Sequence, residues 1–147
     1  MKNNMKLIFD ARGENEALSR MVTAAFLAPL NPTVEELTDI KTAVSEAVTN
    51  AILHGYDSDP AKQVELSCQF SDRTVTVTVR DRGHGIEDIA LAMEPFYTSR
   101  PELERSGMGF TVMQTFMDEL EVHSAREEGT VVRMTKRLSP RDEGVAP

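Results

Sequence analysis

Two stretches of strict apolar–polar alternation, separated by a short turn, constrain this chain more than any other feature of its sequence. Residues 64–70 place Val, Leu, Cys and Phe at every second position, and residues 75–81 place Val, Val, Val and Asp there. Alternate side chains of a strand point to opposite faces of a sheet, so each strand would bury one face. With residues 71–73 as the turn, the pattern predicts a β-hairpin.

Two helical patterns precede this hairpin. Leu18, Met21, Val22 and Ala25 fall at helical spacing and predict an amphipathic first helix. Residues 33–36 read Thr-Val-Glu-Glu, a capping box that predicts the start of a second helix. Together with the later segments, this order of elements predicts an α+β fold, a two-layer α/β sandwich. The other expected elements are strands at 6–9, 120–125 and 130–136 and helices near 88–93 and 110–117.

The length and charge of the chain limit the classes of protein that it can be. Its 147 residues fit a single domain, which we place at residues 1–138, followed by a flexible tail at 139–147. Sixteen basic and 24 acidic residues give a net charge of −8, which argues against direct binding to nucleic acid. No apolar run approaches the roughly 20 residues of a membrane span, so no membrane contact is expected. The single cysteine, Cys68, suits a reducing, cytoplasmic setting.

Regular patterns weaken between residues 82 and 106, a long segment of mixed charge. Loops of this length inside a domain are usually functional, and we expect a mobile lid here. The segment leads to Gly107-Met-Gly109, directly before a predicted helix. Free backbone N–H groups at a helix N-terminus suit phosphate, and Arg105 and Ser106 would add a guanidinium and a hydroxyl. A simple turn is the alternative for two glycines taken alone.

The predicted second helix carries Glu46, Asn50 and His54 at intervals of four residues, so they share one face. This face lies opposite the apolar stripe of the helix, and a solvated surface is the simplest interpretation. The residue types also suit chemistry. A carboxylate can accept a proton from an attacking hydroxyl, and a neutral amide oxygen is a suitable ligand for Mg²⁺.

Asp81 ends the second hairpin strand in phase with its buried valines, so its carboxylate should point to the buried face. A buried charge needs a partner, and a ligand with N–H donors, such as the amine of adenine, would provide one. A strand-end Asp that caps its own turn is the alternative. Gly83 and Gly85 would let the backbone approach a flat ring. Thr130 also points inward, either toward Asp81 or a ligand or as an ordinary core threonine.

In this order, four motifs of the chain resemble the four boxes of the GHKL ATPase superfamily. They are the run from Glu46 to Gly55, then Asp81-x-Gly83-x-Gly85, then Gly107-x-Gly109, then Gly129-Thr130. Within the superfamily the chain is most similar to small serine kinases that act as anti-sigma factors, above all those of the sporulation anti-sigma F type. The resemblance covers nearly the whole chain.

This resemblance implies a Bergerat-type fold, with a mixed sheet, helices on one face, and ATP or ADP held with Mg²⁺ beneath a lid. It implies that Glu46 is the general base toward a protein serine and that Asn50 is the Mg²⁺ ligand. Asp81 would bind the adenine amine. The remaining nucleotide contacts would come from Gly83, Gly85, Arg105, Ser106, Gly107, Gly109 and Thr130.

The resemblance also implies partners. They are a sigma factor of the F type, an anti-anti-sigma protein that is phosphorylated on serine, and a second copy of the chain in a homodimer. Glu16 and Arg20, four residues apart on the first helix, are candidates for partner contact, with a surface salt bridge as the alternative. Two other functions stay open: a non-catalytic module that sequesters a sigma factor, and a catalytic domain of the histidine-kinase type.

Overall fold

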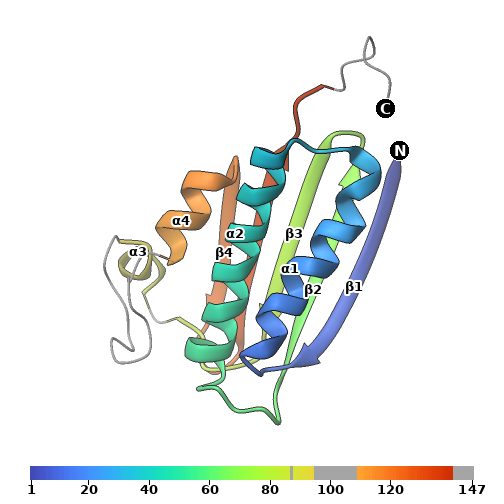
Figure 1. The fold of residues 1–147 in the computed structure, drawn as a ribbon. Coiled ribbons are helices and arrows are strands. Elements are labelled where there is room, and N and C mark those ends of the chain that lie inside the picture. The colour runs from blue at the N-terminus through green and yellow to red at the C-terminus, as the bar shows by residue number, and fades with distance from the viewer. Residues whose placement is uncertain (87, 95–108, 141–147) are drawn as a thin grey trace.

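Five strands form one sheet in the computed structural model, which describes residues 1–86, 88–94 and 109–140 (Figure 1). All four neighbouring pairs of these strands are antiparallel. The strands are β1 (Lys2–Asp10), β2 (Gln63–Ser71), β3 (Thr74–Asp81), β4 (Glu119–Ala125) and β5 (Gly129–Arg137), in the sheet order β1-β2-β3-β5-β4.

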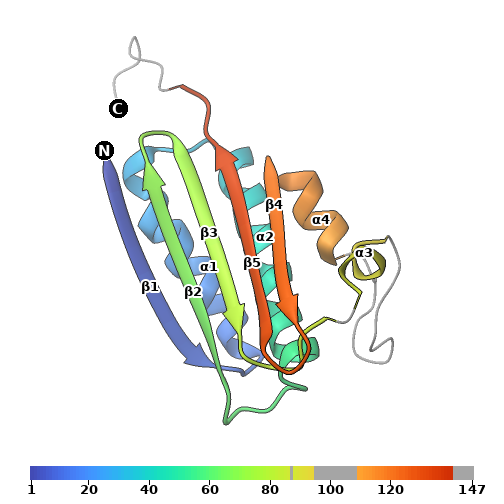
Figure 2. The same cartoon turned by 180° about the vertical axis from the view of Figure 1, so that it is seen from behind.

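The helices lie on one face of this sheet. Figure 1 shows the longer helices in front of the strands, and Figure 2 shows the opposite face of the sheet without a helix on it. No helix among the described residues is long and apolar enough to cross a membrane. The helices are α1 (Glu14–Leu27), a 3₁₀ turn (Ala28–Leu30), α2 (Val34–Asn50), a π-helical turn (Ala51–Gly55), α3 (Ile89–Ala92) and α4 (Gly109–Phe116).

The expected two-layer α+β fold is confirmed, but the sheet is antiparallel where we expected a mixed one. The chain leaves β3, passes through α3 and α4, and returns as β4 in the same direction as β3, which is the usual geometry of a parallel crossover. The hairpin then brings β5 back between them, and β5 pairs antiparallel with both. The two parallel strands are therefore neighbours of β5 and not of each other.

The core lies between the sheet and the helices. The alternation predicted for the hairpin is confirmed, since the even-numbered residues 64–70 of β2 and the odd-numbered residues 75–81 of β3 are buried. The apolar stripe of α2 covers them. The stripe and its neighbours on that helix that are fully buried are Ile40, Ala43, Val44, Ala47 and Val48.

The orientation of α1 differs from the expectation. Its apolar side chains Leu18 and Met21 are exposed, by 41% and 71%, whereas Ser19 and Thr23 are completely buried. The buried hydroxyls are satisfied within the helix, because Ser19 donates to the Glu16 carbonyl and Thr23 to the Ser19 carbonyl. Small hydroxyl residues let α1 lie close to its neighbours, which an apolar pattern alone does not reveal.

Thr33 begins α2 with the predicted capping box. Its hydroxyl accepts from the Glu36 N–H at 3.0 Å, and the Glu36 carboxylate accepts from the Thr33 N–H at 2.9 Å. We expect Thr33→Ala to lower the free energy of unfolding by about 1 kcal/mol, measured by urea denaturation. Thr42→Ala is the control on the same helix, where the hydroxyl bonds only the Thr38 carbonyl, and it should change little. Equal losses in the two variants would contradict the capping role.

Candidate functional site

Glu46 and Asn50 lie one turn apart on α2, where α4 approaches it. Both residues are half-buried. A Cβ atom added to Gly109, the first residue of α4, would lie 3.0 Å from Asn50 Nδ2 and 3.3 Å from Glu46 Oε2. A side chain at position 109 would therefore press on the ends of these two side chains, which lie close to the start of α4. The structure thus brings together a carboxylate, an amide and the positive end of a helix dipole.

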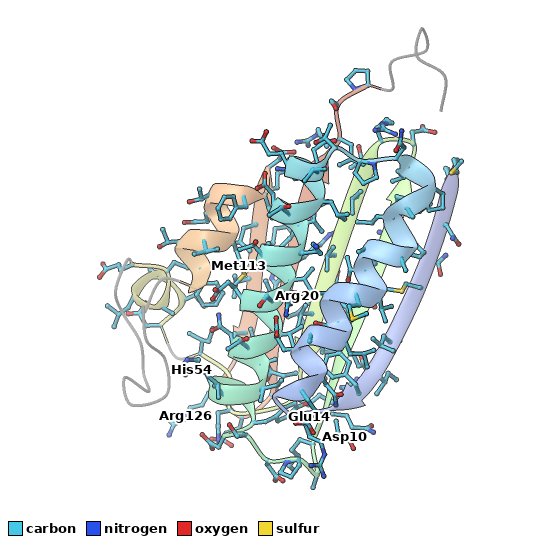
Figure 3. All side chains as sticks on the ribbon, viewed as in Figure 1. Asp10, Glu14, Arg20, His54, Met113 and Arg126 are labelled. Carbon is cyan, nitrogen blue, oxygen red and sulfur yellow. The ribbon has the colours of Figure 1, made fainter. Side chains whose placement is uncertain are left out.

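The last turn of this long helix is wider than an α-helical turn. Residues 51–55 form a π-helical turn in which the Tyr56 N–H donates to the Ala51 carbonyl at 3.1 Å. Such turns occur frequently at functional sites. Figure 3 labels His54 in this turn, at the lower end of α2 and to its left, the side on which α4 lies. The turn ends at Gly55, which lies against the end of β3.

Gly55 lies against Asp81, the last residue of β3, and against Gly83, which follows that strand. A Cβ atom added to Gly55 would lie 2.6–2.8 Å from the three carboxyl atoms of Asp81, and one added to Gly83 would lie 1.8 Å from the Gly55 carbonyl oxygen. The same carbonyl accepts from the His84 N–H at 3.1 Å. The Asp81 carboxylate therefore rests directly on the backbone at the end of the π turn.

Asp81 points to the buried face, as its phase in β3 predicted, and only 6% of it is exposed. Its carboxylate accepts from the backbone N–H of Gly83 at 3.0 Å and from that of Thr130. Burial raises the pKa of this carboxyl from 3.8 to about 6, against the lowering effects of these donors and of His84.

No ion pair among the described residues involves Asp81. With a pKa of about 6, its carboxylate is mostly ionised at pH 7. It keeps free acceptor positions, because two backbone donors do not use all of its lone pairs. A ligand that offers N–H donors, such as adenine, fits this residue.

Gly85 has a φ of +79°, and a Cβ atom there would lie 2.1 Å from the Ala125 carbonyl oxygen. The Glu127 N–H donates to the His84 carbonyl at 2.6 Å, so the segment after Asp81 lies against the turn between β4 and β5. In the structure, Gly83 and Gly85 thus permit close contact with protein backbone. Their contact with a base stays a prediction.

Tyr56 is a buried residue of the site that the sequence analysis missed. Its hydroxyl donates to the Gln63 carbonyl at 2.7 Å and accepts from the Arg82 N–H at 2.6 Å. Burial raises its pKa above 10.0, so the hydroxyl keeps its proton at neutral pH. Tyr56 therefore ties the start of β2 to the residue that follows Asp81. The position of Tyr56 immediately after Gly55 gave no signal of this role.

Thr130 lies opposite Asp81 on β5, as the expected inward phase requires. Ser124, which the sequence analysis also missed, lies opposite Thr130 on β4, and the two hydroxyl oxygens are 2.8 Å apart. The Ile86 N–H donates to the Ser124 hydroxyl at 2.6 Å. The signal for Ser124 was its phase, because it follows Leu120 and Val122 on the same face of β4.

Glu16 and Arg20 form the expected pair on α1, with Arg20 Nε 2.7 Å from Glu16 Oε1. The same carboxylate accepts a hydrogen bond from Ser45 of α2. Since Ser45 precedes Glu46, the pair is linked to the helix that carries the carboxylate described above.

Several predicted site residues lie outside the described residues: Arg105, Ser106 and Gly107. Of the expected lid at 82–106, the structure describes residues 82–86 and 88–94. Within the described part of the chain, no group of three or more His, Cys, Asp or Glu side chains could hold a metal ion. A neutral amide oxygen such as that of Asn50 is a suitable ligand for Mg²⁺, and this role stays a prediction.

Gly55→Ala tests the contact beneath Asp81. The added methyl would overlap the Asp81 carboxyl group, so this buried side chain or the backbone around it must shift, and we expect the free energy of unfolding to fall by about 1–3 kcal/mol. Gly13→Ala is the matched control, because a Cβ atom there meets no atom within 4 Å. Thermal and urea unfolding of both variants would measure the difference. The contact is refuted if Gly55→Ala is as stable as Gly13→Ala.

The raised pKa of Asp81 has a consequence for stability. Between pH 3.8 and about 6 the native protein binds a proton at Asp81 that the unfolded chain does not, so this residue makes the protein less stable as pH rises through that range. We expect the wild type to gain about 2–3 kcal/mol of unfolding free energy relative to Asp81→Asn between pH 7.5 and pH 4. The contributions of the other carboxyl groups cancel, because both proteins contain them. A wild type that loses unfolding free energy relative to Asp81→Asn on acidification would contradict the raised pKa.

Comparisons with known proteins agree with this geometry. Residues 9–136 match the family model of the histidine kinase-like ATPase domain. The anti-sigma F factor of Clostridium perfringens is 56% identical over 139 residues, which cover 95% of this chain and 99% of that protein. The anti-sigma F factor of Oceanobacillus iheyensis is also 56% identical, with 95% of each chain covered.

A solved structure supports the fold alone. The crystal structure of the RsbU and RsbW domains of Rv1364c from Mycobacterium tuberculosis matches with a TM-score of 0.67 and 22% identity, over 92% of this chain and 32% of that one. The match over nearly the whole sequence, together with the arrangement of Glu46, Asn50 and Asp81, leads to one assignment. The chain belongs to the histidine kinase-like (GHKL) ATPase family and, within it, to the anti-sigma F factors.

Proposed function

We propose that the protein is an ATP-dependent serine kinase and anti-sigma factor of the cytoplasm, active as a homodimer. It binds and inhibits a sporulation sigma factor of the F type, and it phosphorylates the anti-anti-sigma antagonist of that factor on serine. The name of its relatives, anti-sigma F factor, supports binding to a sigma factor. The side chains at the junction of α2 and α4 support the kinase activity.

The observation that carries the kinase proposal is the contact of Gly109 with both Glu46 and Asn50. A module that only sequesters a partner needs no general base, yet Glu46 is held at the N-terminus of α4. That is where free backbone N–H groups and the helix dipole would favour phosphate. The proposed base, Glu46, and the proposed phosphate-binding element, the N-terminus of α4, therefore lie next to each other.

ATP or ADP with Mg²⁺ is the cofactor that the residues fit. When bound, ATP would supply the γ-phosphoryl group and leave as ADP, and the metal would offset the negative charge of the phosphates. Asp81 would accept a hydrogen bond from the adenine amine. Thr130, Gly83 and Gly85 would make further contacts with the base. Asn50 would give its amide oxygen to the metal without adding a negative charge next to the phosphates.

Glu46 would act as the general base, because its carboxylate can accept the proton of the attacking serine hydroxyl. Gly109 and the first N–H groups of α4 would hold the phosphates, with Gly107, Arg105 and Ser106 upstream. Most of the work of phosphoryl transfer is positioning and charge stabilisation, which these groups can supply.

The nucleotide would also set the choice of partner. A lid at residues 82–106 that contacts the γ-phosphate would differ between the ATP and ADP states, which gives each state a different surface. Glu16 and Arg20 are the proposed partner contacts on α1. The hydrogen bond that the Ser45 hydroxyl donates to Glu16 supports a link between that surface and the helix of Glu46.

Glu46→Gln tests the kinase proposal. The substitution keeps the size of the side chain but removes the base, so phosphate transfer from γ-labelled ATP to the anti-anti-sigma protein should fall by about 10²–10⁴-fold. ATP binding, measured by equilibrium dialysis, should survive. Glu35→Gln is the matched control, an exposed residue in the first turn of the same helix, and it should keep both properties.

Each result of the transfer assay separates the proposal from its alternatives. Acid-stable phosphate on serine supports it, whereas acid-labile phosphate on the product indicates a histidine-kinase type of chemistry. ATP binding by the wild type with no transfer to any partner indicates a module that only sequesters the sigma factor. Full transfer by Glu46→Gln would remove Glu46 from the mechanism.

A further inference from the structure

One row of polar side chains crosses three strands on the helix-facing side of the sheet. Asp81 of β3 lies opposite Thr130 of β5, and Thr130 lies opposite Ser124 of β4. The adjacent rows are apolar, as in the row of Val79, Val132 and Val122. A single polar row at the end of an apolar face is costly to bury unless its groups are hydrogen-bonded, so its hydrogen bonds can be counted one by one.

Ser124 makes three contacts through one hydroxyl group. It accepts from the Ile86 N–H at 2.6 Å, it lies 3.1 Å from the Gly129 carbonyl oxygen, and it lies 2.8 Å from the Thr130 hydroxyl oxygen. A hydroxyl has one proton and two lone pairs. A carbonyl oxygen can only accept, so Ser124 must use its proton on Gly129. All three contacts are then hydrogen bonds only if Thr130 donates its own proton to Ser124.

The position of the Thr130 hydroxyl proton decides which hydrogen bonds this hydroxyl can make with groups other than Ser124. With its proton held by Ser124, the Thr130 hydroxyl has only lone pairs left, so it can accept but not donate. The neighbouring Asp81 carboxylate is also an acceptor, and its two identified donors are backbone N–H groups. The row therefore presents two acceptors side by side and no hydroxyl donor.

We propose that Ser124 is a specificity-determining residue of the nucleotide site: by taking the Thr130 proton it keeps the row acceptor-only, which favours a purine with a 6-amino group over a 6-oxo purine. An amino group brings two N–H donors to these acceptors. A 6-oxo purine brings a carbonyl, which is a third acceptor against them, and only one N–H donor, on N1. The inference rests on the nucleotide binding proposed above, and Ser124 acts through Thr130 without touching the base.

Ser124→Ala removes the group that holds the Thr130 proton. Thr130 is then able to donate, either to a 6-oxo group or to Asp81, and either change reduces the advantage of the amino group. Affinities for ADP and for inosine diphosphate, which differ in the group at position 6 and in the proton on N1, can be measured by titration calorimetry on the full chain. We expect the dissociation constant for inosine diphosphate divided by that for ADP to fall about fivefold to tenfold in this variant, which is the effect of one net hydrogen bond.

Ser124→Thr is the matched control, because it keeps the hydroxyl, and its ratio should stay within about twofold of the wild type. A loss of packing alone would weaken both nucleotides equally and leave the ratio unchanged, so the ratio reports on the proton and not on general loosening. If Ser124→Ala does not fold, Ser124→Cys makes the same test, since a thiol is a weak acceptor.

The outcomes distinguish this inference from the function on which it rests. A wild type that binds neither nucleotide overturns both. A wild type that prefers ADP, with the full preference kept in Ser124→Ala, overturns the role of Ser124 alone. An equal fall of the ratio in Ser124→Ala and Ser124→Thr overturns it as well.

Discussion

The burial of one carboxylate at the end of β3 is the constraint on which the rest of the site depends. Asp81 is almost completely covered, and this burial raises the pKa of its carboxyl group to about 6. The backbone N–H groups of Gly83 and Thr130 donate to this carboxylate. Gly55, which has no side chain, leaves room for it. Tyr56 fixes the neighbouring backbone. The local structure thus tolerates an unfavourable charge, which is expected where the charge serves binding.

Much of the fold could be predicted because its signals are local. The alternation of the hairpin and the capping box at Thr33 each lie within a few residues, and both are confirmed. The orientation of α1 could not be predicted, because the close approach of neighbouring elements selects Ser19 and Thr23 for the interior and leaves Met21 exposed. The position of β5 between β3 and β4 is a long-range choice that no local pattern records.

The same distinction applies to the site. The four-residue spacing of Glu46 and Asn50 predicted a shared face, and the phase of Asp81 predicted its burial, so the structure confirms both placements. What covers that face was not predictable, because α4 lies far along the chain from α2. The chemical roles assigned to these residues stay predictions. The phase of Ser124 placed it on the inner face of β4, but it was missed because its importance comes from its cross-strand neighbour Thr130.

The insertion of β5 has a consequence for how the protein matures. One of the two backbone donors to Asp81 comes from Thr130, which is among the last residues of the sheet to be synthesised. During translation the N-terminal part emerges first, and a contact between distant segments must wait for the later one. A nascent or truncated chain that ends before β5 therefore lacks one of the two backbone donors to Asp81. The full set of backbone donors to Asp81 therefore exists only after β5 has been synthesised and has paired with β3.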